Sequence, residues 1–135
     1  MSDLDKYGIS KKWNAQEEIV YCTALMYNIV SGSIANYLKD YNLTVGKFNI
    51  LFVLKSHGGV EGIKQVEISK HLIVTPSNMT KMIDKLEKEG FVTRSALEGD
   101  RRVNMVKITG KAQELLENIW DGYNKVIQNS VQNLS

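Results

Sequence analysis

The spacing of apolar residues changes near Gly90 in this 135-residue chain, and the change sets what the chain can fold into. Up to Leu86, apolar side chains recur every three or four residues, which places them along one face of a helix. Residues 91–94 have the pattern of a short strand, and residues 103–108 alternate with a period of two. The helical spacing then returns and continues to Val131. The sequence therefore predicts a mainly α fold with one small β-hairpin.

Capping residues indicate where the predicted helices begin and end. A first long helix covers about residues 14–40, and Thr44 is a suitable N-cap for a second helix, with His57 near its C-terminal dipole. A short helix is predicted over about residues 64–72. Thr75 and Pro76 are predicted as the N-cap and first position of the next helix, because proline has no N–H to leave unpaired there. Thr109 is predicted to cap the last helix.

The two terminal helices carry more apolar surface than one chain of this length can bury. In the first helix one stripe includes Ile19, Met26 and Ile29, and other apolar residues widen it. The last helix has a stripe from Ala112 to Val131. We therefore expect about residues 10–42 and 111–135 to form a dimerisation scaffold, covered by a second copy of the chain, within a single domain over residues 1–135.

The middle of the chain has the outline of a helix-turn-helix. A short helix, a three-residue turn and a longer helix with a polar, basic outer face follow one another. A hairpin comes directly after, and its loop, predicted over residues 95–102, carries Arg101 and Arg102. A hairpin in this position is a wing, so the sequence predicts a winged helix-turn-helix head over about residues 43–110.

Basic charge is concentrated in this predicted head. Residues 43–110 hold eleven Lys and Arg against seven Asp and Glu, whereas residues 1–42 and 111–135 each have one more acidic than basic residue. The net charge of the whole chain is only +2. A basic centre between near-neutral ends favours a head that binds a polyanion, and ordinary charge scatter is the alternative.

The order of these motifs resembles the multiple antibiotic resistance regulator (MarR) family of winged helix-turn-helix repressors. The resemblance rests on Leu-Glu-Lys-x-Gly-Phe-Val-x-Arg at residues 86–94 and on Gly-Asp-Arg-Arg at residues 99–102. With the long terminal helices, it covers nearly the whole chain from about residue 14. It implies a homodimer that regulates transcription by binding a pseudo-palindromic operator in double-stranded DNA. A cytoplasmic setting is favoured separately, because a single cysteine cannot form an intramolecular disulfide. It also implies that small aromatic or phenolic ligands relieve this binding.

The resemblance also places individual residues at the DNA. Asp100 would brace the wing by a charge-assisted contact. Many relatives have an arginine where this chain has Thr75 and Pro76, so one strong guanine-reading side chain is missing. The DNA-binding residues implied by position are Thr75, Pro76, Ser77, Asn78, Thr80, Lys81, Arg101 and Arg102.

The chemistry of these side chains suits a DNA groove. The amide of Asn78 can pair with an adenine edge, and Lys81 can reach a guanine or a phosphate. Hydroxyl groups can donate to phosphates, and arginines in a wing suit a narrow minor groove. Further along the same helix, Lys85 and Lys88 are predicted to pair with Asp84 or Glu89 on a solvated face.

Other function classes find little support in the sequence. An enzyme is not predicted, because the chain has no glycine-rich phosphate loop and no credible nucleophile–base set. One cysteine and two histidines make a structural zinc site implausible, and no cofactor is predicted. No apolar run is long enough to span a membrane, and no secretory signal is apparent. The main alternative is an adaptor that uses the winged fold to bind another protein.

Cys22 and the aromatic residues each have two interpretations. Some relatives sense peroxides through a cysteine in the first helix, so Cys22 is a candidate redox residue. However, it lies on the apolar stripe without a nearby basic residue in the sequence, which favours a buried structural role. Trp13, Trp120 and the tyrosines could line a pocket for an aromatic ligand between scaffold and heads, or pack in the dimer interface.

Overall fold

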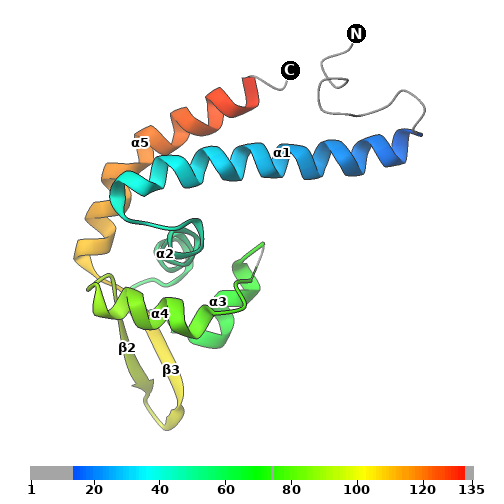
Figure 1. Ribbon diagram of the computed structural model, residues 1–135. Coiled ribbons are helices and arrows are strands. Elements are labelled where there is room, and N and C mark those ends of the chain that lie inside the picture. The colour runs from blue at the N-terminus through cyan, green and yellow to red at the C-terminus, as the bar shows by residue number, and fades with distance from the viewer. Residues whose placement is uncertain (1–13, 74, 133–135) are drawn as a thin grey trace.

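A computed structural model describes residues 14–73 and 75–132 of the chain, and these residues form a mostly helical fold with one small sheet (Figure 1). No helix in these two ranges is long and apolar enough to cross a membrane. In chain order the elements are α1 (Ala15–Leu38), the short 3-10 helix η2 (Lys39–Tyr41), α2 (Val45–His57), β1 (Ile63–Lys64), α3 (Gln65–His71), α4 (Met79–Lys88), β2 (Val92–Leu97), β3 (Asp100–Ile108) and α5 (Gly110–Gln132).

Helix α1 begins at a capping box and extends away from the rest of the fold. The Asn14 side chain accepts from the Glu17 amide at 2.9 Å, and Glu17 accepts in return from the Asn14 amide at 3.2 Å. This exchange satisfies two amides that a helix start leaves unpaired. Figure 1 shows the first half of α1 projecting beyond α5 and α2. Its apolar side chains are consequently exposed, with Ile19 at 65% and Val20 at 66%.

The core lies around α2, which packs against α1, α3, α4, α5 and β3. Thr44 caps this helix by accepting from the Lys47 amide at 3.2 Å, as its sequence predicts. Ile50, Leu51 and Leu54 are almost completely buried. Because α2 is apolar on several sides, it can pack against the scaffold and the head at once. The residues that close over it include Ile68, Ile83, Leu86, Val106, Leu116 and Ile119.

Helix α5 packs against the second half of α1 and joins the scaffold to the head. Thr109 accepts from the Ala112 amide at 3.3 Å at the start of α5, which confirms its predicted capping role. Further along, the Tyr37 hydroxyl of α1 donates to the Ile119 carbonyl at 3.0 Å. Burial, with a smaller effect from the neighbouring Tyr41 hydroxyl, raises the pKa of Tyr37 to about 12. The phenol therefore remains a hydrogen-bond donor at neutral pH.

The sheet contains one more strand than the sequence indicates, in the order β1-β3-β2. Strand β1 pairs antiparallel with β3, with Ile63 opposite Val106 and Lys64 opposite Met105. Two residues are too few to show a period of two, so the hydrophobic pattern missed this strand. Residue 62 has to be glycine, since its φ is +81° and a Cβ there would collide with the Val106 carbonyl oxygen.

The predicted loop over residues 95–102 is wrong, because most of it is strand. Strand β2 continues to Leu97 and β3 begins at Asp100, which leaves a two-residue turn. Gly99 adopts φ +90° in that turn, a conformation that glycine reaches without strain. Arg101 and Arg102 therefore lie on β3. The hairpin projects from the fold (Figure 1), so both of its faces can be polar and the alternation disappears.

The predicted start of the helix after the turn is also wrong. Helix α4 begins at Met79 with Asn78 as N-cap, three residues after Thr75. Asn78 has φ −113° and ψ 35°, outside the helical region, so the helical hydrogen-bond ladder cannot extend back to Pro76. The first bond of that ladder at this end runs from the Met82 amide to the Asn78 carbonyl at 3.0 Å.

Candidate nucleic-acid interface

Helix α4 presents one apolar face to the core and one polar face to solvent. Ile83 and Leu86 are fully buried, and Met82 packs beside them. The Met82 side chain lies against Gly46 of α2, where a Cβ would collide with it. This close approach holds α4 against the central helix. The exposed residues of α4 include Thr80, Lys81, Lys85 and Lys88.

The residues predicted to read DNA lie at the beginning of α4 and in the turn before it. Ser77 and Asn78 are exposed in the turn, and Thr80 and Lys81 are exposed in the first turn of the helix. Asn78 occupies the N-cap position, but its side chain makes no capping hydrogen bond within the described part of the chain. Its amide group is therefore available to a base edge. Thr75 is exposed, and Pro76 is half-buried near Gly46.

The ion pairs predicted within α4 for Lys85 and Lys88 are not formed. Asp84 instead pairs with Arg94 of β2, and Glu89 pairs with Lys47 of α2. Both carboxylates pair with basic residues of other elements, whose side chains are mostly buried against α4. Among the described residues no salt bridge involves either lysine. Their ammonium groups are consequently available to a phosphate backbone.

The wing carries two arginines in different environments. The Asp100 carboxylate accepts from the backbone amide of Arg102 at 3.1 Å and from its Nε at 3.2 Å. These contacts hold the start of β3 next to the turn. The Arg101 side chain is exposed and forms no salt bridge with any residue that the structure describes. The two arginines should therefore contribute differently to binding.

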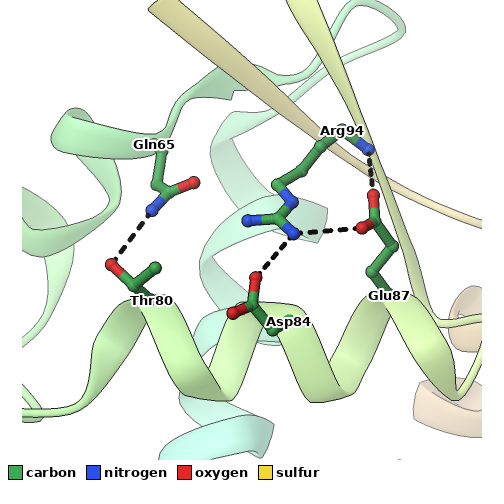
Figure 2. A network of polar contacts seen from close by, with 5 residues as sticks. All are labelled: Gln65, Thr80, Asp84, Glu87 and Arg94. Carbon is green, nitrogen blue, oxygen red and sulfur yellow. Dashed lines mark hydrogen bonds and ion pairs between the residues drawn. The ribbon is translucent and has the colours of Figure 1, made fainter.

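A polar network behind α4 was not predicted from the sequence. Figure 2 shows Arg94 of β2 reaching Asp84 and Glu87 on α4, while Gln65 of α3 reaches Thr80. The hydrogen bond from Arg94 lowers the pKa of Glu87, and the same bond raises the pKa of Arg94. The sequence did contain the residues of this network, because two carboxylates lie three residues apart on the helix and an arginine follows in the next strand. Sequence spacing alone did not show that they meet.

Cavities lined by aromatic side chains run along α2. One of about 510 Å³ lies between α2 and α5, and stacked rings of Phe52 and Trp120, 5.7 Å apart, form part of its wall. A second of about 410 Å³ lies between α1 and α2 and includes Tyr27, Tyr123 and Ile73. Ile73 comes from the turn of the helix-turn-helix, so this cavity joins scaffold and head. Trp13, also predicted to line a ligand pocket, lies outside the described residues.

Cys22 and the two histidines occupy other places in the fold. Cys22 is half-buried on the first half of α1, away from the head. His57 is the last residue of α2, as the sequence predicts, and its ring stacks on that of His71 with 4.1 Å between centroids. No group of three or more His, Cys, Asp or Glu side chains in residues 14–73 and 75–132 could hold a metal ion.

The sequence is similar to bacterial helix-turn-helix regulators. It is 29% identical over 104 residues to the uncharacterized HTH-type transcriptional regulator YfiV of Bacillus subtilis, covering 77% of this chain. The chain spans 62% and 59% of the length of two curated relatives that it matches. Residues 43–103, which contain the helix-turn-helix and most of the wing, match the sequence model of the MarR family.

Solved structures share the fold at low sequence identity. A putative MarR-like transcription regulator from Bacillus cereus superposes with a TM-score of 0.80 at 20% identity, over 87% of this chain and 82% of that one. Sco3205, a MarR family transcriptional regulator from Streptomyces coelicolor solved in complex with DNA, gives 0.77 at 19% identity, over 93% and 79%. Residues 43–103 therefore match the MarR family, and the winged-helix fold that surrounds them is shared with solved MarR-family structures over most of the chain.

Proposed function

We propose that this chain is a cytoplasmic transcriptional repressor that binds a pseudo-palindromic operator as a homodimer. The observation that carries the proposal is the exposed start of α4, where the amide of Asn78 makes no capping bond among the described residues, together with a wing whose exposed Arg101 forms no salt bridge within the same residues. A helix of this kind fits the major groove, and an arginine beside it reaches the backbone or the minor groove. The Streptomyces coelicolor relative in complex with DNA supports this use of the fold.

The exposed half of α1 supports the homodimer. Ile19 and Val20 are about two thirds exposed, and Met26 and Tyr27 are about half exposed. A contiguous apolar surface of this kind marks an interaction site. A second copy related by a two-fold axis would cover it, and would place two α4 helices on one side of the dimer. Their half-sites would then be about 10 base pairs apart, the spacing of one turn of DNA.

Selection of bound fragments from random-sequence DNA tests the proposal, followed by footprinting of the fragments that are enriched. We expect an inverted repeat that the protein protects on one face of the duplex. A reporter under the control of such a site should be repressed when the chain is expressed. Failure to enrich any sequence would contradict the proposal and favour the alternative of a protein-binding adaptor.

The dimer is tested by placing a charge on the exposed surface of α1. Ile19→Glu should lower the dimer's stability, because a charge would be buried without a partner at the interface, and sedimentation would show more monomer. Glu18→Gln, on the adjacent residue, is a control for changes in α1 itself. Ile119 is unsuitable for this purpose because it is fully buried within one chain, and a charge there would unfold the protein.

A small aromatic ligand in the cavities along α2 is a second part of the proposal. The cavity beside Ile73 supports it, because a bound ring would contact α1, α2 and the turn that leads into α4. A ligand that favours one spacing of the heads shifts the equilibrium away from the DNA-binding state. Titration with phenols and aromatic acids should raise the melting temperature of the protein and release the operator. The proposal of a ligand is rejected if none of these compounds binds.

A further inference from the structure

Arg94 is a basic residue of the head whose side chain is turned toward the protein. It is 22% exposed, and its Nη2 lies 2.6 Å from Asp84 Oδ1 and 3.0 Å from Glu87 Oε1. The backbone amide of Arg94 also donates to Glu87 Oε2 at 3.1 Å. Glu87 is thus held through both of its carboxylate oxygens by a single residue of β2 (Figure 2). Two charge-assisted bonds in fixed directions restrict geometry more than one flexible ion pair does.

The partners of Arg94 lie on the helix that is proposed to read DNA. Asp84 and Glu87 are one helical turn apart on α4, on the side that faces β2 (Figure 2). Strand β2 is the first strand of the wing, and the turn after it leads to Asp100 and Arg101 at the start of β3. The contacts of Arg94 therefore connect the helix and the wing at one point. If this connection is released, the helix start and the wing arginines no longer have a fixed separation.

A second contact connects α4 to the helix that precedes it. Gln65, the first residue of α3, has its Nε2 3.5 Å from the Thr80 hydroxyl, a long contact. Its Oε1 is buried and has no hydrogen-bond partner within the described ranges. Figure 2 shows this oxygen on the side of Gln65 that faces the Arg94 guanidinium. Gln65 therefore contacts α4 at Thr80, one helical turn before Asp84.

The charges argue for a geometric role rather than a direct contact with phosphate. Asp84 and Glu87 place two negative charges on a helix that approaches a polyanion, which weakens DNA binding when considered alone. The side chains of both carboxylates are about 40% exposed, so they are not needed to fill the core. A role in holding Arg94 explains why they are present on this helix. Arg94 in turn uses its charge on these carboxylates. Its guanidinium is thus occupied before DNA arrives.

We propose that Arg94 is a positioning residue that sets the angle between α4 and the wing, and so determines how strongly the protein distinguishes its operator from other DNA. This inference rests on the proposed function. It assigns specificity to a residue that does not touch a base. Gln65 supports the arrangement from α3. Loss of the network should impair binding to the operator, where both elements must fit, more than binding to random DNA, where phosphate contacts dominate.

The experiment compares affinities for the selected operator and for random-sequence duplex. The variants are Arg94→Gln, Arg94→Lys, Asp84→Asn and Glu87→Gln. Glu98→Gln is the matched control, because it removes one negative charge from the exposed turn of the wing, and Glu98 forms no salt bridge in the described structure. Thermal unfolding of each variant establishes that the head is folded.

Positioning and charge predict opposite results for the two carboxylates. If only charge matters, Asp84→Asn and Glu87→Gln should strengthen binding to both DNAs, as Glu98→Gln does. Positioning predicts that Glu87→Gln and Arg94→Gln weaken operator binding by about tenfold, which is about 1.4 kcal/mol, without weakening binding to random DNA. Arg94→Lys should recover part of the loss, because lysine retains the charge without the two-pronged geometry.

Two outcomes would overturn the inference. One is a parallel change of both affinities in the Arg94 and Glu87 variants, and the other is stronger operator binding by Glu87→Gln. If Arg94→Gln does not fold, Asp84→Asn and Glu87→Gln decide the question, since they leave β2 unchanged. A wild-type protein that selects no operator contradicts the proposed function itself, which is a different result from equal selectivity of wild type and variants.

Discussion

The Tyr37 hydroxyl of α1 fills the space in which a side chain at Gly122 of α5 would lie. An ideal Cβ on Gly122 would collide with the oxygen and the ring carbons of Tyr37. From this position the hydroxyl donates to the Ile119 carbonyl at 3.0 Å and lies 3.4 Å from the Tyr41 hydroxyl. The missing side chain of one helix and the phenol of the other together fix how closely α1 and α5 approach.

We expect Gly122→Ala to destabilise the protein, although alanine is the better helix former. The added methyl group must displace Tyr37, and overpacking of this kind costs about 1–3 kcal/mol. Gly110→Ala is the matched control, because a Cβ there meets nothing within 4 Å. That substitution should leave stability unchanged or raise it by about 0.4–1 kcal/mol. Thermal unfolding of both variants is the measurement, and equal stability would show that Tyr37 moves freely.

The ion pair of Glu87 should make the stability of the head depend on acidic pH. The hydrogen bond from Arg94 lowers the pKa of Glu87 below its usual value of 4.5. A carboxyl group with a lowered pKa in the folded state stabilises the fold above its unfolded pKa, and this contribution is lost as pH falls through the folded pKa. Wild type should therefore be more stable than Glu87→Gln at neutral pH, and the difference should shrink as pH falls through the lowered folded-state pKa of Glu87.

Unfolding curves measured from neutral pH down to pH 3 would show this convergence. Glu114→Gln is a suitable control, because Glu114 is exposed on α5 and forms no salt bridge among the described residues. It should differ little from wild type at any pH. A constant difference between wild type and Glu87→Gln over the whole range would mean that the ion pair with Arg94 does not stabilise the head.

The sequence predicted the elements whose pattern is local. Thr44 and Thr109 cap helices at the predicted positions, and Gly90 ends α4 with a φ of +82°. Side-chain spacing and capping depend on residues three or four apart, which a single sequence displays. The predicted mainly α fold with a small β-hairpin wing was correct for the same reason, since the period changes where the helix ends.

The errors arose where contacts distant in the sequence decide the structure. Strand β1 exists because Ile63 meets Val106, and Lys64 meets Met105, across more than forty residues. The pairing of Asp84 with Arg94, instead of a lysine on its own helix, follows from the packing of β2 behind α4. Such pairs have no fixed spacing, so only the assembled fold shows them.

The two arginines of the wing should differ in their effect on DNA binding. Arg101→Ala should weaken binding to operator and random DNA alike, and reduce the slope of log affinity against log salt by about 1, because one phosphate contact is lost. Arg102→Ala should have a smaller effect on this slope, since part of its charge is used by Asp100 at 3.2 Å. Titrations at several salt concentrations measure both. An unchanged slope in the double variant would show that the wing does not contact DNA.

Asn78 should read a base without stabilising the helix that carries it. It stands at the N-cap of α4, where asparagine usually bonds to a backbone amide, but no such bond is formed within the described residues. Asn78→Ala should therefore leave thermal stability almost unchanged. In contrast, it should reduce discrimination at one base pair of each half-site, by about 1–3 kcal/mol for a lost bidentate contact. Affinities for operators mutated one base pair at a time would locate that position. If Asn78→Ala lowers stability and affects all operators equally, the amide is a helix cap in solution and another side chain reads the base.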